Sequence, residues 1–415
     1  MVDFIEDQEI FSNTQFGFRK NMGTETALTN YIDYIQTELN KKTSGNYIIS
    51  VFMDLSKAFD VICHNILKTK LEHYGFRGNF LEFLLSFIKD RQYFVNINGK
   101  NSDTKTVNMG VPQGSTLGPL LFLLFINDMR FASLLLYLTQ FADDSTATYS
   151  SDKLDETIIT MEDEFKKILE WLNANKLIIN LNKTHLMLFT NRNRPESISL
   201  SVNNNIINEV SETKFLGVIV DNKLCWDAHI NHISQKISKS VSILKMLKYT
   251  FPTNALKTIY YSLIYPYFNY CNLIWGSAAS THLESLVLLQ KKSIRIISKV
   301  GYLDHTEFLF KDHKMITVPK IYDYNCVKFI FQCYNNHKYS FFRSKLLTNS
   351  DFHSYETRNK DLLRKPIVRL SRFKNSFLTK GMDIWNILPD KIKTVKSFNS
   401  FKIAAKNHMS RPSES

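Results

Sequence analysis

The stretch "LLLYLTQFADDSTATYS", residues 134–150, places two aspartates side by side behind a run of apolar residues. Asp143 and Asp144 repel each other when both are ionised, and an apolar flank raises the energy of each charged form. A chain tolerates such a pair in two situations. Either the pair lies in a solvated hairpin turn, or a cation lies between the two carboxylates. This stretch alone leaves both interpretations open.

The charge of the chain is divided unevenly along its length. Residues 1–221 carry a formal net charge of −6 and residues 222–415 carry +19. A strongly basic half indicates a polyanionic partner, and nucleic acid is favoured over a merely soluble basic domain. The 415 residues, 44% of them hydrophobic, predict two or three domains.

The cysteines and the apolar runs indicate the compartment of the chain and whether it enters a membrane. Five scattered cysteines without a C-x-x-C pair are typical of reduced thiols in an intracellular protein. The start "MVDFIEDQEI" lacks the features of a signal peptide. The runs "LLFLLFI" and "LLLYL" are too short to span a bilayer, so we expect no membrane partner.

The pattern of apolar residues predicts an α+β front half and a mostly helical back half. "NYIISVFMDL" is typical of a buried strand, and "RQYFVNINGKNSDTKTVNMG" of a hairpin. Residues 131–150 predict strand, tight turn and strand, and residues 153–175 an amphipathic helix. "KTHLMLF" and "TKFLGVIVD" predict one further strand each, all within an antiparallel sheet.

A third carboxylate resolves the question that the aspartate pair raises. Asp54 ends the buried strand in "SVFMDL", which places it at an edge of the sheet, and the Asp143–Asp144 turn belongs to strands that can lie beside it. Three acids from neighbouring strands suit a pair of Mg²⁺ ions about 3.5–4 Å apart, as phosphoryl transfer requires.

Two further features of this region carry open interpretations. Phe59, five residues after Asp54, can lie under an incoming sugar and exclude a 2′-hydroxyl, although ordinary core packing explains a phenylalanine at least as well. The segment Pro112-Gln113-Gly114 predicts a loop that a nucleotide can approach, but a surface turn explains it equally well.

Six motifs in order resemble the reverse transcriptase of non-LTR retrotransposons, most closely the jockey-type, LINE-like group. They are "QFGFRKNMGT", "FMDLSKAFDVICHNIL", "VPQGSTLGPLLFLLFINDM", "FADD", "INLNKTHLMLF" and "KFLGVIVD". The resemblance is close over residues 12–221 and looser beyond them. It implies a right-hand polymerase palm with partial fingers in residues 1–221. It further implies a helical thumb in 222–300 and a basic C-terminal region in 301–415.

The resemblance also implies roles for matching positions. The implied metal ligands and catalytic acids are Asp54, Asp143 and Asp144, and the implied donor of a proton to pyrophosphate is Lys183. The implied contacts to the incoming nucleotide and template are Phe59 as steric gate, Gln113, Gly114, Arg19 and Lys20. The implied primer grip is Phe215, Leu216 and Gly217. For Lys183, Arg19 and Lys20, a solvated surface role stays open.

The resemblance implies RNA-directed DNA polymerase activity with two Mg²⁺ ions, or Mn²⁺ in their place. The implied partners are an RNA template, a DNA primer, dNTPs and a ribonucleoprotein with the element's RNA, in the nucleus, the cytoplasm or both. Family members carry further fingers sequence upstream of "QFGFR", so we expect an N-terminally truncated chain. Two alternatives stay open: a catalytically inactive nucleic-acid-binding remnant, and another palm polymerase such as a group II intron maturase.

Overall fold

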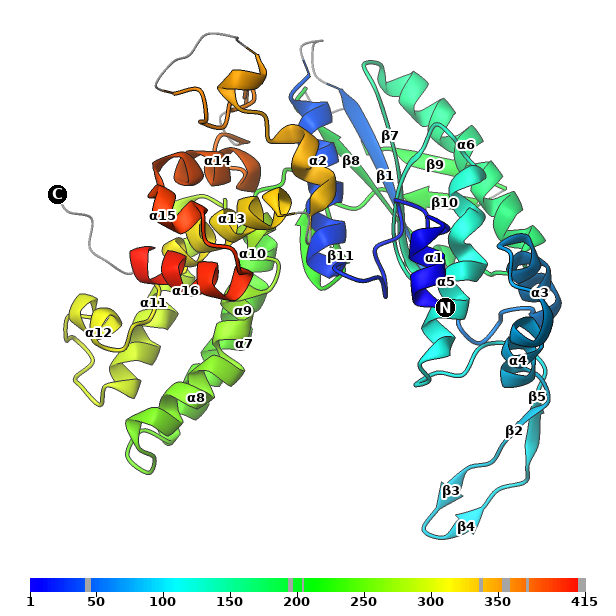
Figure 1. The fold of residues 1–415 in the computed structure, drawn as a ribbon, viewed down its shortest axis with the longest axis horizontal. Helices are drawn as coiled ribbons and strands as arrows, with labels where there is room; N and C mark the ends of the chain where they lie inside the picture. The colour runs from blue at the N-terminus through cyan, green and yellow to red at the C-terminus, as the bar shows by residue number, and fades with distance from the viewer. Residues whose placement is uncertain are drawn as a thin grey trace. The chain divides into compact units, whose positions relative to one another are not determined.

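The computed structural model describes residues 1–41, 46–192, 197–203, 205–335, 339–352, 359–370 and 373–409 (Figure 1). The chain divides into two compact units, Met1–Leu216 and Gly217–Ser415. No helix in the described ranges is both long enough and apolar enough to cross a membrane.

The first unit mixes helices with short strands. Its helices are α1 (Val2–Asp7), α2 (Thr24–Leu39), α3 (His64–His73), α4 (Gly78–Ile88), α5 (Leu117–Ile126), η1 (Asn127–Phe131), α6 (Leu154–Ala174) and η2 (Leu181–Lys183). Its strands are β1 (Tyr47–Met53), β2 (Arg91–Tyr93), β3 (Asn96–Ile97), β4 (Lys100–Asn101), β5 (Lys105–Val107), β6 (Tyr137–Phe141), β7 (Asp144–Ser151), β8 (His185–Thr190), β9 (Ser199–Val202), β10 (Asn205–Asn208) and β11 (Glu212–Phe215). The predicted α+β class is confirmed for this unit.

A four-stranded antiparallel sheet, in the order β6-β7-β1-β8, forms the centre of the first unit. Successive side chains of β1 point to opposite faces, as strand geometry requires. Val51 and Met53 enter the large core that α5 and α6 complete, while Phe52 meets Tyr31 of α2 edge to face. Both faces of the sheet are therefore covered by helices, with α2 and α6 on opposite sides in Figure 1.

Two strand predictions need correction. The strand before the aspartate pair begins only at Tyr137, and the preceding Leu134 and Leu135 are exposed instead of paired. The predicted single strand "TKFLGVIVD" is two strands, β11 and β12, interrupted at Leu216 and Gly217. Both of these residues have positive φ, +46° and +80°, and a strand cannot continue through that conformation.

The second unit is mostly helical, as the pattern of apolar residues predicts. Its elements are β12 (Val218–Asp221), α7 (Asp227–Met246), α8 (Thr253–Leu263), α9 (Tyr265–Asn269), α10 (Asn272–Trp275), α11 (Ser280–Ile297), α12 (Glu307–Asp312), α13 (Val318–Tyr334), η3 (Ser340–Lys345), η4 (Asn349–Asp351), α14 (Phe377–Ile387), α15 (Asp390–Lys393) and α16 (Phe398–Met409). Most residues of α13 are buried, because α14, α16 and α10 pack around it. Phe329 of α13 contacts the rings of Phe342 and Phe377 edge to face.

Candidate active site

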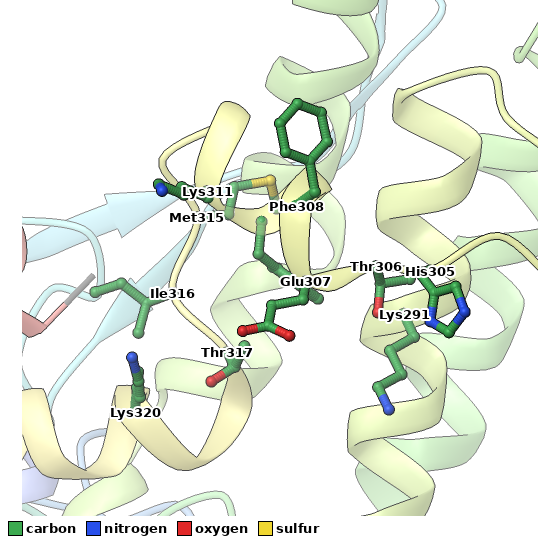
Figure 2. Close-up of a pocket in the computed structure, with 11 residues that line it drawn as sticks. Lys291, His305, Thr306, Glu307, Phe308, Lys311, Met315, Ile316, Thr317 and Lys320 are labelled. Carbon is green, nitrogen blue, oxygen red and sulfur yellow. The ribbon is translucent and has the colours of Figure 1, made fainter. Parts of the chain in front are cut away.

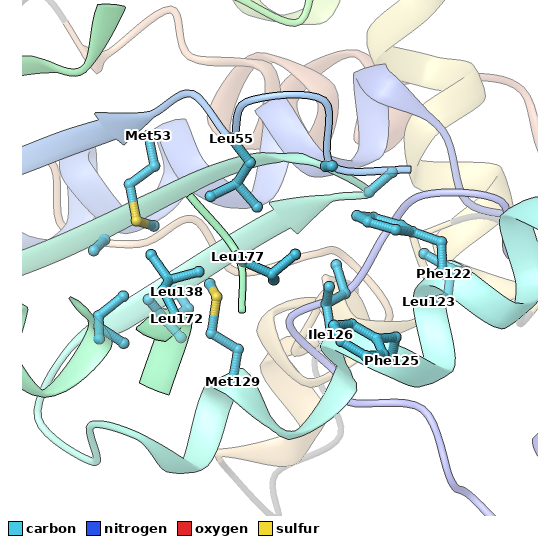
Figure 3. Close-up of a cluster of buried hydrophobic side chains, with 14 of the residues drawn as sticks. Met53, Leu55, Phe122, Leu123, Phe125, Ile126, Met129, Leu138, Leu172 and Leu177 are labelled. Atoms are coloured by element: carbon cyan, nitrogen blue, oxygen red, sulfur yellow. The ribbon is translucent and has the colours of Figure 1, made fainter. Parts of the chain in front are cut away.

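Asp54 lies at the point where β1 leaves the sheet. The flanking Met53 and Leu55 are buried in the core beneath, where Leu138, Leu172 and Leu177 surround them (Figure 3). Because strand neighbours alternate, the half-buried Asp54 side chain points away from that core.

Asp143 lies in the turn between β6 and β7, and Asp144 is the first residue of β7. Phe141 pairs directly with Asp144, so the turn has only two residues, Ala142 and Asp143. Ala142 has φ of +55°, which a tight two-residue turn of this kind requires. Since Met53 pairs with Ser145 across β1 and β7, the register brings Asp54 beside Asp144 at the same edge of the sheet.

The electrostatics of this edge follow from three neighbouring acids. Burial, and then the negative charges of Asp143 and Asp54, raise the pKa of the Asp144 carboxyl to about 6. Burial is also the first cause that raises the pKa of Asp143, and the Asp54 charge adds to it. The surroundings of Asp143 and Asp144 therefore disfavour their charged forms, in part because the Asp54 carboxylate is nearby.

The donor set at this edge suits a hard divalent cation, because carboxylate oxygens are the ligands that Mg²⁺ prefers. A cation would also remove the mutual repulsion that raises the pKa of Asp144. The carboxylates do not already converge: within the described ranges no three His, Cys, Asp or Glu side chains form a group that could hold a metal ion. Metal binding at this edge therefore needs rotation of aspartate side chains toward one another. The assignment of the three ligands stays a prediction.

The turn between β6 and β7 is held by the "QFGFR" motif. The Gln15 side-chain oxygen accepts hydrogen bonds from the backbone N–H groups of Ala142, at 3.0 Å, and of Gly17, at 2.8 Å. The backbone N–H of Phe16 donates to the Gln140 carbonyl at 2.8 Å, and Gln15 bridges Gln140 in parallel. The segment around Gln15 thus adds a short parallel strand to the outer edge of β6.

Gly17 packs directly against this turn. A Cβ at this position would lie 2.6 Å from the backbone nitrogen of Ala142, closer than real Cβ contacts. Glycine is therefore required here by the close approach of two backbones. Gln15, only 1% exposed, and Gly17 are site residues that the sequence did not single out. Their place in the motif "QFGFR", beside Arg19, was the signal that pointed to them.

Phe59 and the loop at Gln113 lie together. The backbone N–H of Val111 donates to the Phe59 carbonyl at 2.9 Å, and the Gln113 amide donates to the Asp60 carboxylate at 2.8 Å. The half-buried Phe59 ring stacks on Phe122 of α5, with ring centroids 4.2 Å apart. The ring thus has a packing partner on one side and remains partly exposed.

Gly114 is the exposed tip of this loop. It has φ of +80°, and a Cβ added there would meet nothing within 4 Å. The space beside this backbone is therefore open to a ligand.

Lys183 lies in a turn that is attached to Asp54. The backbone N–H of Asn180 donates to the Asp54 carbonyl at 2.8 Å, and Ile179 bridges Leu55 in antiparallel fashion. The N–H of Lys183 donates back to the Asn180 carbonyl at 3.1 Å, and its side chain is exposed. This arrangement holds the lysine backbone near the end of β1, whereas its proton-donor role stays a prediction.

The Arg19 side chain forms its contacts with other residues of the first unit. Its guanidinium forms an ion pair with Glu6 at 3.0 Å and donates to the carbonyls of Ser12 and Gln15. Only 12% of its side chain is exposed, whereas Lys20 is exposed. Arg19 therefore organises the loop that carries Gln15, and its expected contact with a nucleotide stays a prediction.

The three residues of the expected primer grip, Phe215, Leu216 and Gly217, have different surroundings. Phe215 is buried and contacts the rings of Tyr31 and Phe52 edge to face. Leu216 is also buried, and Gly217 approaches the ring of Tyr270. Phe215 thus packs against the residue two positions before Asp54 in β1.

The comparisons agree with the resemblance found in the sequence. Residues 1–220 match the family described as reverse transcriptase (RNA-dependent DNA polymerase). The chain is 29% identical over 326 residues to a probable RNA-directed DNA polymerase from transposon X-element of Drosophila melanogaster, covering 77% of this chain and 35% of that protein. It is 30% identical over 320 residues to the RNA-directed DNA polymerase from mobile element jockey of Drosophila funebris, covering 74% and 34%. The chain thus spans about a third of the length of these relatives.

Among the solved structures to which the chain shows some similarity is apo telomerase from Candida tropicalis. That structure has 15% sequence identity and a TM-score of 0.41, and the match covers 75% of this chain and 51% of that chain.

Proposed function

This chain belongs to the reverse transcriptase family, and from that premise we propose that it is the RNA-directed DNA polymerase of a non-LTR retrotransposon. The reaction would join deoxynucleotides to a primer 3′-hydroxyl in the order that an RNA template dictates. The observation that supports the proposal is the pairing of β1 with β7, whose register puts Asp54 beside Asp144 at the edge that also carries Asp143. Burial and neighbouring negative charge raise the pKa of Asp143 and of Asp144 there.

In this proposal the three aspartates hold two Mg²⁺ ions, or Mn²⁺ in their place. When bound, such ions lower the pKa of an attacking hydroxyl and neutralise charge on the transferred phosphate and on pyrophosphate. Asp54, just after β1, and Asp143, in the turn between β6 and β7, contribute ligands, and Gln15 holds that turn. The chain's contribution is mainly to position these acids before the substrate arrives.

The remaining residues act on the nucleotide and the primer. Phe59, supported from behind by Phe122, lies under the sugar and disfavours a 2′-hydroxyl. Gln113 and Gly114 contact the nucleotide and the template base from the exposed loop. Lys183 donates a proton to the departing pyrophosphate. These assignments rest on the family's motifs and on the exposure of the side chains.

Further residues and regions of the chain bind the template, the nucleotide and the primer. Arg19 and Lys20 serve the template or the triphosphate, with Arg19 acting through the loop that it organises. Phe215, Leu216 and Gly217 support the primer end. Residues 222–300 serve as the thumb and residues 301–415 as a basic C-terminal region. The partners are an RNA template, a DNA primer and dNTPs, within a ribonucleoprotein in the nucleus, the cytoplasm or both.

A primer-extension assay on poly(rA)/oligo(dT) with Mg²⁺ tests the proposal. The full chain is compared with Asp143→Asn and with Asp152→Asn, a matched change at an exposed acid just after β7. We expect extension by the wild type and by Asp152→Asn, and none above background by Asp143→Asn. The last variant loses a ligand without losing volume.

Two outcomes would contradict the proposal. Equal extension by the wild type and Asp143→Asn would mean that the acids are misassigned or that another polymerase is present. Absence of extension by all three proteins, together with salt-sensitive binding of primer–template duplex, would favour the inactive nucleic-acid-binding remnant.

A further inference from the structure

A groove in the second unit lies between α7 and α11, which pack against each other (Figure 1). Its volume is about 520 Å³, and its walls come from the C-terminal halves of both helices and from the segments just after each of them. The floor is apolar, since Val241, Leu289 and Ile296 are buried beneath it.

The rim of this groove is basic. Lys245, Lys248, Lys292 and Arg295 line it, and no lining residue is acidic. No ion pair connects these four cations to an acid anywhere in the part of the chain that the structure describes. The Lys248 ammonium donates to the Val300 carbonyl at 2.9 Å, and this bond fixes it at the groove. The groove therefore attracts a polyanion.

Asp304, an acid next to Arg295, is engaged in a turn. The Asp304 carboxylate accepts a hydrogen bond from the backbone N–H of Gly301 at 2.7 Å. Arg295 donates through Nε to the Asp304 carbonyl at 2.8 Å, which uses one of the five N–H donors of its guanidinium. Arg295 is thus oriented by this turn with donors left for a phosphate.

Two tyrosine rings extend over the same groove. Tyr249 is 82% exposed and Tyr302 is 70% exposed. Each has a cation over its ring, with Lys248 5.2 Å from the centre of Tyr249 and Arg295 6.0 Å from the centre of Tyr302. Exposed aromatic rings beside cations provide sites for unpaired nucleotides, since each nucleotide has a flat base that can stack and a phosphate that a cation can contact.

A second hollow lies beside α12 and differs from the groove in its charges and in its aromatic rings (Figure 2). It contains Lys291, Lys311 and Lys320, but Glu307 lies among them. Figure 2 shows the lysine ammonium groups spread around the hollow without converging. Its exposed rings are Phe308 and the imidazole of His305, neither of them a tyrosine, which makes it a suitable control surface for the groove.

We propose that the groove between α7 and α11 binds a single-stranded segment of nucleic acid. Unpaired bases stack on Tyr249 and Tyr302, and the four cations contact the phosphates on either side. A duplex cannot use the tyrosines in this way because its bases already stack on one another. The proposal concerns binding alone and does not depend on the carboxylates of the first unit.

The test measures binding of the full chain to fluorescein-labelled 12-mers by fluorescence anisotropy. The probes are oligo(rU), oligo(dT) and a 12-base-pair duplex. The variants are Tyr249→Ala/Tyr302→Ala, Tyr249→Phe/Tyr302→Phe and Lys245→Gln/Lys292→Gln. The matched control is Phe308→Ala/Lys311→Gln in the hollow beside α12. Circular dichroism establishes that each variant is folded as the wild type is.

We expect the double alanine variant to bind the single strands about 10- to 100-fold more weakly and the duplex within about twofold of wild type. The double phenylalanine variant keeps the rings and restores binding. The double glutamine variant lowers the slope of log K against log salt for single strands by about 1.4. Loss of either single strand supports the proposal, and the larger loss identifies the preferred sugar.

Three results would overturn the inference. An equal loss for single strands and duplex would indicate a general phosphate-binding surface instead of a stacking groove. Unchanged single-strand binding in the double alanine variant would place the site elsewhere. An equal loss in the control variant would mean that binding is spread over the basic surface. None of these results depends on whether the chain extends a primer.

Discussion

The side-chain oxygen of Gln15 and the backbone N–H of Ala142 are joined by a hydrogen bond of 3.0 Å. This bond connects a residue near the N-terminus to the turn that carries Asp143. Because Gln15 also accepts the N–H of Gly17, one buried oxygen serves two backbone donors. The position of the aspartate turn therefore depends on a side chain that does not contact the substrate in our proposal.

Replacing Gln15 by methionine should weaken both stability and activity. The variant keeps the volume but leaves two backbone donors without their acceptor, which costs about 1–3 kcal/mol for each fully buried donor. We expect a lower urea midpoint and a fall in kcat for primer extension, measured under saturating dNTP. Gln140→Met is the matched control, since it removes a buried amide from β6 that accepts from Thr14 and not from the turn. If both variants lose activity in proportion to stability, Gln15 has no specific positioning role.

Gly17→Ala should displace the turn by steric contact. The added Cβ would lie 2.6 Å from the Ala142 nitrogen, where backbone, and not a flexible side chain, must yield. Gly23→Ala is the control, because a Cβ there meets nothing within 4 Å and its φ of −172° is open to any residue. Thermal unfolding and primer extension should both decline for the first variant only. Equal behaviour of the two variants would show that the turn accommodates the added methyl.

Asp144 should make the stability of the chain depend on pH between about 4 and 6. Its folded pKa of about 6 exceeds the ordinary value of about 3.9, so the folded state binds more protons in that window. The stabilising contribution is present below about pH 4 and is lost as the pH rises through 6. Because Asp144 is exposed in part, solvent screening limits the effect to about 1 kcal/mol or less.

Asp144→Asn should flatten this dependence. Urea unfolding from pH 4 to 7 should show a smaller decline for the variant than for the wild type. Asp152→Asn should retain the wild-type slope, since Asp152 is exposed and lies beyond the site. A steeper slope in Asp144→Asn would contradict the assignment of the raised pKa to this group.

Added Mg²⁺ should stabilise the wild-type chain at pH 7. A ligand that binds only the folded state raises the free energy of unfolding by about 2.7 kcal/mol at a hundred times its Kd. We expect the increase in melting temperature to vanish in Asp143→Asn and to diminish below pH 6, where Asp144 binds a proton. An unchanged Mg²⁺ effect in Asp143→Asn would exclude this turn as the metal site. Chelation with EDTA should reverse the stabilisation.

Phe59→Val should increase the use of ribonucleotides. The smaller side chain removes the ring from beneath the sugar, so the ratio of kcat/KM for rNTP over dNTP should rise about tenfold or more. Phe122→Leu is the control on the buried side of the same ring stack. It should lower the unfolding midpoint and largely keep the discrimination. A rise of similar size in both variants would indicate that loosened packing, and not the gate, sets the preference.

The helices and strands that depend on the local pattern of apolar residues could be predicted from the sequence. The buried strand before Asp54 follows from a short apolar, β-branched run, and the tight turn at the aspartate pair follows from the strand pattern on either side of it. The strand at "TKFLGVIVD" was wrong because Leu216 adopts a positive φ, and only the glycine after it signals a turn.

Contacts between distant segments could not be predicted in this way. The parallel pairing of Gln15 with Gln140 joins residues that are far apart in sequence, and no periodicity records it. The ion pair between Arg19 and Glu6 likewise depends on how α1 packs. The order of motifs along the chain identified the segments of the site but not the bonds between them.

The attachment of the Lys183 turn to Asp54 has a consequence for synthesis of the protein. The Asp54 carbonyl receives its hydrogen bond from Asn180, and Asp144 comes from a strand made between them. A nascent chain that ends before residue 180 therefore lacks part of the frame around all three acids. The ribosome must release most of the first unit before this edge can assemble, so a translation arrest within it yields a chain whose carboxylates are exposed but unorganised.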